Sequence, residues 1–130
     1  METRSDIKGL DDIISFVNKF YEKVQQDDLI GPIFNNVIED WSPHLEKMYS
    51  FWNAVLFGVP GFTGNPFARH APLPIQEQHF ERWILLFQET IDALFVGEMA
   101  ENTKKKAETM AIMFLSKLKA MRGGPTRVIV

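Results

Sequence analysis

The chain has 130 residues, 45% of them hydrophobic and 24% charged, which is the size and composition of one globular domain with its own core. Its net charge of −3 gives no reason to expect nucleic acid or an anionic membrane as a partner, and no apolar run reaches the ~20 residues that span a bilayer. The absence of cysteine excludes disulfides, thiolate catalysis and cysteine-ligated metals, and the polar start does not resemble a signal peptide. We therefore expect a single cytoplasmic domain over residues 1–130.

The N-terminal part of the sequence has the periodicity of a helix. Apolar residues recur with the three- and four-residue spacing of one helix face over residues 13–24, and Tyr21 lies beside this stripe. Asp27-Asp28 marks the end of this predicted helix. Gly31-Pro32 then predicts a turn before Phe34.

A second helical pattern follows the turn. Ser42-Pro43 predicts its beginning, with the serine as N-cap and the proline at the first helical position, and Gly58 predicts its end. One apolar stripe of this helix carries His44, Met48, Phe51 and Val55, and Trp52 lies beside that stripe.

The next stretch of the chain has no periodicity. Residues 58–69 contain three glycines and two prolines, and loops of such length in small domains are usually functional. His70 follows directly, and Pro72 and Pro74 prevent a long helix after it. A neutral imidazole on a constrained segment that faces apolar helices is what an axial ligand of haem iron requires. The alternative is a loop histidine that only makes local hydrogen bonds.

Two further helices are predicted in the C-terminal half. The first begins near Gln76, carries Trp83 and Phe87 on its apolar stripe, and ends at Gly97. The last helix ends at Gly123-Gly124-Pro125, so that residues 123–130 form a flexible tail. Because no strand-length alternation, repeat or linker occurs, we predict an all-α fold.

The aromatic and polar residues on the stripes have two explanations. Packing alone accounts for each phenylalanine taken singly. However, Tyr21, His44 and Trp83 bring polar atoms onto or beside apolar stripes of three different predicted helices, where each atom needs a partner inside the fold. Such convergence indicates a buried polar group, and a diatomic ligand on a metal is one candidate.

Taken in order, these motifs resemble those of the truncated haemoglobins over about residues 10–120. The matching segments are Phe20-Tyr21-Glu22-Lys23-Val24, Leu29-Ile30-Gly31-Pro32-Ile33-Phe34, His44, Phe51-Trp52, His70 before Leu73-Pro74, and Phe80-Glu81-Arg82-Trp83. The sequence is most similar to the third group. The paired glycines that the first two groups carry between helices are absent, and Phe34, His44 and Trp83 stand where that group commonly has these residue types.

The resemblance implies a globin-like, two-over-two helical sandwich that encloses haem b. It implies His70 as the proximal iron ligand, and Tyr21 and Trp83 as hydrogen-bond donors to the distal ligand. Bound dioxygen is partly anionic, so a phenol or indole donor stabilises it more than it stabilises carbon monoxide. The expected cofactor contacts are His70, Phe34, Met48, Phe51, Trp52, Phe87 and Arg69.

Several polar residues keep more than one interpretation. His44 is a distal gate or water-holding group, a second axial ligand in the ligand-free state, or a surface residue in the first helical turn. His79 is expected to be a solvent-side or capping residue near the start of its helix. Arg69, Arg82 and Lys47 are candidate partners for the haem propionates, with exposed charges as the alternative.

We therefore predict a haem protein that binds oxygen, nitric oxide and carbon monoxide, and that traps or detoxifies its ligand rather than delivering oxygen. One alternative is a nitric oxide dioxygenase or a peroxidase-like enzyme. It would depend on an external reductase, because the chain has no glycine-rich nucleotide-binding motif. A haem-free helical sensor or interaction module, with residues 58–74 as its partner-binding loop, is the alternative from another class.

Overall fold

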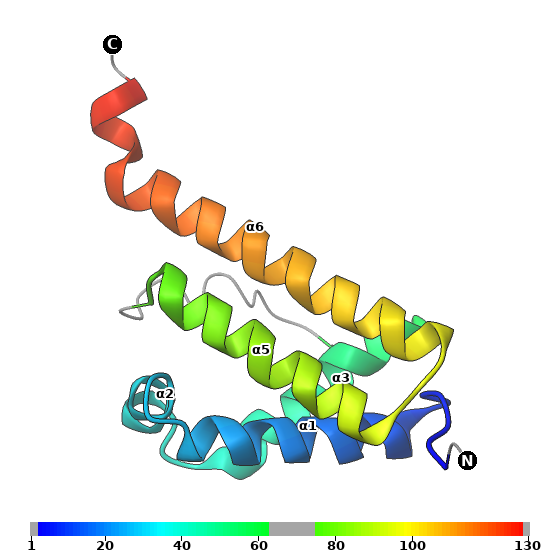
Figure 1. Cartoon of the computed structure of the whole chain (residues 1–130). Helices are drawn as coiled ribbons and strands as arrows, with labels where there is room; N and C mark the ends of the chain where they lie inside the picture. Colours follow the sequence, from blue (N-terminus) through cyan, green and yellow to red (C-terminus); the bar gives the residue numbers. More distant parts are fainter. Residues whose placement is uncertain (1–2, 63–74, 129–130) are drawn as a thin grey trace.

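The structure is a computed structural model that describes residues 3–62 and 75–128, with side chains up to Met121. The described residues form five helices (Figure 1), and their only strand-like contact is an isolated bridge between Ser5 and Phe95. The helices are α1 (Leu10–Gln26), α2 (Gly31–Val37), α3 (Trp41–Phe57), α5 (Glu77–Leu94) and α6 (Glu98–Val128). The prediction of an all-α fold is confirmed. None of the described helices combines the length and hydropathy needed to cross a bilayer.

The helices form two packed pairs. α1 packs against α2, α3 and α5, and α5 packs against α6. Figure 1 shows α5 and α6 side by side with α1 crossing beneath them, and α6 extending beyond the other helices at its C-terminal end. The pair of α1 and α3 therefore lies against the pair of α5 and α6, with the short α2 at one end.

The core forms where the stripe of α1 meets the stripe of α5. Phe16 and Phe20 are almost completely buried on α1, as are Phe87 and Ile91 on α5. The Phe87 ring makes edge contacts with Phe16 and Phe20, at centroid distances of 5.8 Å and 5.2 Å. Such edge-to-face pairs add about 0.5–1.5 kcal/mol each beyond the burial of apolar area. This aromatic centre sets the spacing of the two helix pairs.

The turn predicted at Gly31-Pro32 is instead the beginning of a helix. Proline is tolerated in the first turn of α2 because the N–H group that it lacks has no intrahelical partner there. Gly31 is buried, and an added Cβ would lie 2.9 Å from the carbonyl oxygen of Val24. Glycine therefore permits α2 to begin directly against the end of α1.

The predicted start of α3 is also corrected. The N-cap is Asp40 rather than Ser42, because the Asp40 carboxylate accepts a hydrogen bond of 3.1 Å from the Ser42 backbone N–H. Pro43 then falls within the first turn, where it costs no intrahelical hydrogen bond. The predicted end at Gly58 is confirmed, because this residue has the left-handed φ of 66° that favours glycine.

The last helix is longer than predicted. We expected it to end at Gly123-Gly124-Pro125, but α6 continues to Val128. A proline inside a helix removes one backbone hydrogen bond and bends the axis without always ending the helix. Accordingly, the axis of α6 changes direction in its last turns (Figure 1).

Candidate functional site

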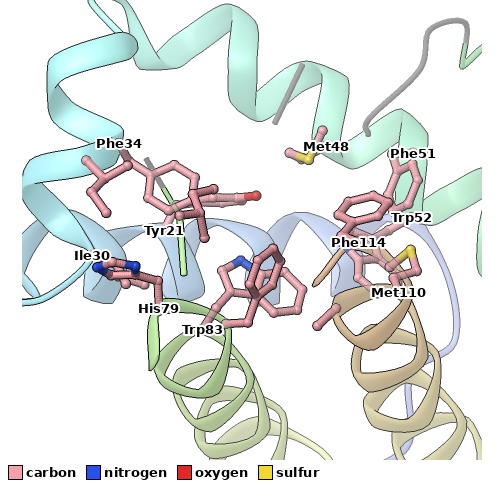
Figure 2. Close-up of a pocket in the computed structure, with 14 residues that line it drawn as sticks. Tyr21, Ile30, Phe34, Met48, Phe51, Trp52, His79, Trp83, Met110 and Phe114 are labelled. Carbon is pink, nitrogen blue, oxygen red and sulfur yellow. The ribbon is translucent and has the colours of Figure 1, made fainter. Parts of the chain in front are cut away.

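An apolar cavity lies between the two helix pairs, with the end of α2 at one side (Figure 2). The space between its walls is about 750 Å³, including the part open to solvent. Its walls are Tyr21, Ile30, Ile33, Phe34, Met48, Phe51, Trp52, Ile75, His79, Phe80, Trp83, Met110, Ala111 and Phe114. Four of these side chains carry a nitrogen-bound or oxygen-bound hydrogen in walls that are otherwise apolar or aromatic: Tyr21, Trp52, His79 and Trp83.

Tyr21 enters the cavity from α1. Its side chain is 6% exposed, and its ring makes an edge contact with Phe20 at a centroid distance of 4.8 Å. Burial raises the pKa of the Tyr21 phenol well above its ordinary value of 10.0, because the ionised form would lose its solvation. The hydroxyl therefore keeps its proton at neutral pH and is able to donate a hydrogen bond.

Trp83 enters the cavity from α5. Its indole stacks on Phe87 at 5.5 Å with an interplanar angle of 12°, and it meets the edge of Phe20 at 5.4 Å. Figure 2 shows the labelled side chains of Tyr21 and Trp83 directed into the same cavity from different helices. The structure thus brings together the two donors that the sequence predicted.

Most of the predicted cofactor contacts line the cavity. Phe34 comes from α2, and Met48, Phe51 and Trp52 come from α3. Phe87 differs, because it lies behind the wall and is stacked on both Trp83 and Trp52, at 5.5 Å and 5.2 Å. Its ring supports two lining residues, and its contact with the cofactor stays a prediction.

His44 lies next to Tyr21. It is the fourth residue of α3, is half-buried, and makes edge contacts with the rings of Tyr21 at 5.1 Å and Trp41 at 5.5 Å. Because the helix begins at Trp41 rather than at Pro43, His44 is deeper in the helix than we expected. Its ring contacts the ring of Tyr21 and belongs to the layer around the cavity.

His79 is confirmed as a capping residue. Its Nδ1 accepts a hydrogen bond of 2.8 Å from the Gln76 backbone N–H at the start of α5. The structure adds that the same side chain lines the cavity, which the sequence did not indicate. The other lining residues that we did not select have no chemical signature, since Ile30, Ile33, Ile75, Phe80, Met110, Ala111 and Phe114 differ from core residues only in facing an empty space.

Two predicted site residues, His70 and Arg69, lie outside the described residues. Among the other candidates for propionate partners, Arg82 has a protein partner. Its Nη1 donates to Asp27 Oδ1 at 2.7 Å, and the Asp27 side chain is 9% exposed. Burial opposes ionisation of Asp27, but the N–H groups of Ile30 and Leu29 and the Arg82 guanidinium outweigh it and lower the pKa of this carboxyl.

Two packed pairs of helices around an apolar, aromatic-walled cavity with two converging donors define the class of the truncated globins, in which the cavity holds haem. The residues present fit that group. The cavity walls are aromatic and apolar, as the faces of a flat macrocycle require, and Tyr21 and Trp83 add polar groups to these walls.

Comparisons with known proteins agree with this class. The sequence matches the model of the bacterial-like globin family over residues 5–121. It is 35% identical over 111 residues to the group 3 truncated haemoglobin of Campylobacter jejuni, covering 82% of this chain and 87% of that protein. The crystal structure of the group III truncated haemoglobin from Campylobacter jejuni has a TM-score of 0.82 at 33% identity, covering 89% of this chain and 95% of the other.

More distant relatives share the fold. The group 2 truncated haemoglobin of Bacillus subtilis is 32% identical over 91 residues, which is 65% of this chain and 67% of that protein. The structure of a truncated oxygen-avid haemoglobin from Bacillus subtilis has a TM-score of 0.71 at 24% identity, covering 82% of this chain and 93% of that one. The chain belongs to the bacterial-like globin family and is a truncated haemoglobin similar to those of group III. It is therefore a haem-based binder of small gaseous ligands, with the predicted two-over-two fold.

Proposed function

We propose that this protein holds haem b in the cavity, with His70 as the iron ligand, and that it retains oxygen or nitric oxide for trapping or detoxification. The observation that carries the proposal is the convergence of Tyr21 and Trp83 in one apolar cavity. A carrier that delivers oxygen needs rapid release, and two donors at the ligand oppose rapid release.

When bound, haem supplies the iron that takes up the diatomic gas. The chain supplies two donors whose protons remain in place, because burial raises the pKa of Tyr21 and an indole N–H does not titrate. A hydrogen bond to a partly charged acceptor contributes about 1–3 kcal/mol, and each 1.4 kcal/mol changes a rate or equilibrium about tenfold. Two donors therefore slow oxygen release by orders of magnitude and affect carbon monoxide, which carries little charge, much less.

The first experiment tests haem binding and its ligand. Purified protein is titrated with hemin, and the visible spectrum is followed for wild type, His70→Gly and His79→Ala. We expect one haem per chain in wild type, loss of tight binding in His70→Gly with partial rescue by imidazole, and an unchanged spectrum in His79→Ala. A folded wild type that takes up no hemin would contradict the proposal, and loss of the iron–histidine bond only in His79→Ala would contradict the assignment of His70.

The second experiment tests the donors. Tyr21→Phe removes the phenol and keeps the ring, and Trp83→Phe removes the indole N–H with some loss of volume. Stopped-flow oxygen release should be faster in each variant, and in the double variant the two effects should not add, because two donors share one small acceptor. Unchanged oxygen release in both single variants would mean that neither residue donates to the ligand.

The same two donors favour an enzymatic alternative. Nitric oxide, dioxygen and one electron together give nitrate, and hydrogen peroxide with two electrons and two protons gives two water molecules. Both reactions need a reductase or another electron donor, for which we propose the cytoplasm as the location. Nitrate formed by the reduced, oxygen-loaded protein after addition of nitric oxide would support the first reaction. Turnover that persists in the double variant of Tyr21 and Trp83 would contradict a role for these donors.

A further inference from the structure

We propose that the ion pair between Asp27 and Arg82 is a positioning device for the two donors of the cavity. It sets how α1 and α2 lie relative to α5 and thereby controls the release of the bound gas, although neither residue lines the cavity. The inference rests on the proposed function, because it concerns the geometry of Tyr21 and Trp83.

The carboxylate of Asp27, the residue that follows α1, connects the end of α1 to the α1–α2 connection and to α5. Its Oδ2 accepts hydrogen bonds of 3.0 Å from the backbone N–H groups of Leu29 and Ile30, which form the connection from α1 to α2. Its Oδ1 accepts the Arg82 hydrogen bond of 2.7 Å from α5. Both oxygens are therefore engaged, and charge-assisted bonds of this kind have a defined direction and length.

Each of the three pieces also contributes to the cavity wall. Ile30, whose N–H is held by Asp27, lines the cavity directly and is followed by Phe34 on α2. Tyr21 lies six residues before Asp27 on α1, which is about 9 Å along a helix axis. We call Asp27, its partner Arg82 and the connection from α1 to α2 the Asp27 corner. A shift of this corner therefore moves Tyr21, Ile30 and Phe34 together.

Arg82 occupies the corresponding place on α5. The lining residues His79, Phe80 and Trp83 surround it in sequence, within the first two turns of this helix. Because consecutive helical residues point about 100° apart, Arg82 is directed to the corner while Trp83 is directed to the cavity. A change in the position of Arg82 is transmitted to Trp83 through the rigid backbone of the same turn.

The corner needs such a connection because α2 is short. A helix of seven residues is unstable by itself, so its position depends on tertiary contacts. Gly31 allows α2 to lie close to the end of α1, because a Cβ added there would be only 2.9 Å from the Val24 carbonyl oxygen. This close approach does not by itself fix the position of α5. The carboxylate of Asp27 connects the segment before α2 to Arg82 on α5.

The test compares variants of this corner with a matched control. Arg82→Met keeps the aliphatic length and removes the charge, and Arg82→Lys keeps the charge with a different geometry. The control is Asp6→Asn, because Asp6 also has a lowered pKa and also accepts two N–H groups at a helix start, those of Met99 and Ala100, far from the cavity. All are compared as haem-loaded protein.

Three measurements are made. These are oxygen and carbon monoxide release by stopped flow, the carbon monoxide stretching frequency, which responds to nearby donors, and amide hydrogen exchange at Leu29, Ile30, Met99 and Ala100. In Arg82→Met we expect the rate of oxygen release to rise about tenfold. This is less than the roughly 10²-fold change in rate that a 1 Å misplacement of a positioned group can cause. Carbon monoxide release changes less, the stretching frequency shifts, and exchange rises at Leu29 and Ile30. Arg82→Lys should be intermediate.

In Asp6→Asn, exchange should rise only at Met99 and Ala100, with both release rates unchanged. A second arm combines Arg82→Met with Trp83→Phe, and the two effects on oxygen release should not add. The inference is overturned if Arg82→Met or Arg82→Lys increases exchange at Leu29 and Ile30 while oxygen release stays at the wild-type rate. It is equally overturned if Asp6→Asn accelerates release as much. Failure of the proposed function has a different signature, since wild type would then not bind hemin, or Tyr21→Phe and Trp83→Phe would leave release unchanged.

Discussion

Two corners of the molecule are each held by an aspartate that accepts backbone N–H groups, and the two corners differ in what they support. At one corner Asp27 connects the α1–α2 junction to α5 beside the cavity. At the opposite corner Asp6 connects the N-terminal segment to the start of α6, where it accepts the N–H groups of Met99 and Ala100 at 2.9 Å and 2.8 Å. Each aspartate satisfies backbone donors that a helix start leaves without intrahelical partners.

The difference lies in what is attached to each corner. At the Asp6 corner the Val96 N–H donates a hydrogen bond of 3.1 Å to the Ser5 carbonyl, which connects the N-terminal segment to the α5–α6 connection. Neither Ser5 nor Val96 lines the cavity. The Asp27 corner contains the lining residue Ile30 and adjoins Trp83 through Arg82. The comparison teaches that the functional importance of a capping carboxylate depends on which residues surround it, because both aspartates accept backbone N–H groups and only Asp27 lies among residues next to the cavity.

The largest effect is expected from Gly97→Ala at the Asp6 corner. Gly97 has a φ of 140°, which side chains rarely adopt, and an added Cβ would lie 2.5 Å from the Asp6 carboxyl. Backbone strain and overpacking each cost about 1–3 kcal/mol, so the free energy of unfolding should fall by about 3 kcal/mol. Denaturant unfolding followed by circular dichroism measures this loss. Oxygen release should remain at the wild-type rate, and an accelerated release would remove the distinction between the corners.

A smaller loss of stability with a larger functional effect is expected from Gly31→Ala at the Asp27 corner. An added Cβ would meet the backbone carbonyls of Val24 and Gln25 at 2.9 Å and 3.0 Å, and these atoms cannot rotate away. Overpacking should lower the free energy of unfolding by about 1–3 kcal/mol and displace α2 with Phe34. We expect faster oxygen release by stopped flow. A variant that is destabilised yet releases oxygen normally would show that α2 does not control the cavity.

Acid should weaken both corners and alter ligand release through only one of them. In both carboxyls burial raises the pKa and hydrogen bonds lower it more, to below the ordinary value of 3.8. A lowered folded-state pKa gives stability that is present above pH 3.8 and is lost as pH falls through the folded-state value. Unfolding measured from pH 6 down to pH 3 should therefore be less pH-dependent in Asp6→Asn and in Asp27→Asn than in wild type. If the stability of either variant depends on pH as steeply as that of wild type, the replaced aspartate does not contribute to the pH dependence of stability.

The smallest effect is expected from an exposed ion pair. Lys119 and Glu77 join α6 to α5 at 3.8 Å, and both side chains are 61% exposed. Exposed pairs of this kind contribute about 0–1 kcal/mol, so Glu77→Gln should leave both the unfolding midpoint and oxygen release within error. This variant calibrates the other measurements. A clear loss of stability would indicate that charges on α5 act over longer distances than the corner comparison assumes.

Part of the candidate site was predictable because its residues obey helical periodicity. Tyr21 and Trp83 lie on or beside apolar stripes, and a stripe that builds the core also points its neighbours inward. Periodicity does not reveal which member of a stripe lines a cavity and which lies behind it, as Phe87 lies behind Trp52 and Trp83. The roles of His70 and Arg69 remain predictions.

The remaining features depend on contacts between distant segments. Asp27 and Arg82 are 55 residues apart, and Asp6 and Ala100 are 94 residues apart, so no local pattern connects them. Gly31-Pro32 carries the local signature of a turn, yet tertiary packing of α2 against α1 makes it a helix start. Local signals compete with burial, and burial prevails where a close approach is needed.

The sequence by itself determined the four longer helices α1, α3, α5 and α6, their apolar faces, and the choice of Tyr21 and Trp83 as candidate donors, because periodicity and side-chain chemistry are properties of neighbouring residues. It also carried the resemblance to the truncated haemoglobins. Only the tertiary structure decided which wall residues face the cavity, where α2 begins, and that Arg82 pairs with Asp27. These depend on how rigid helices pack across one another, which is settled by the burial of many side chains at once rather than by any short segment.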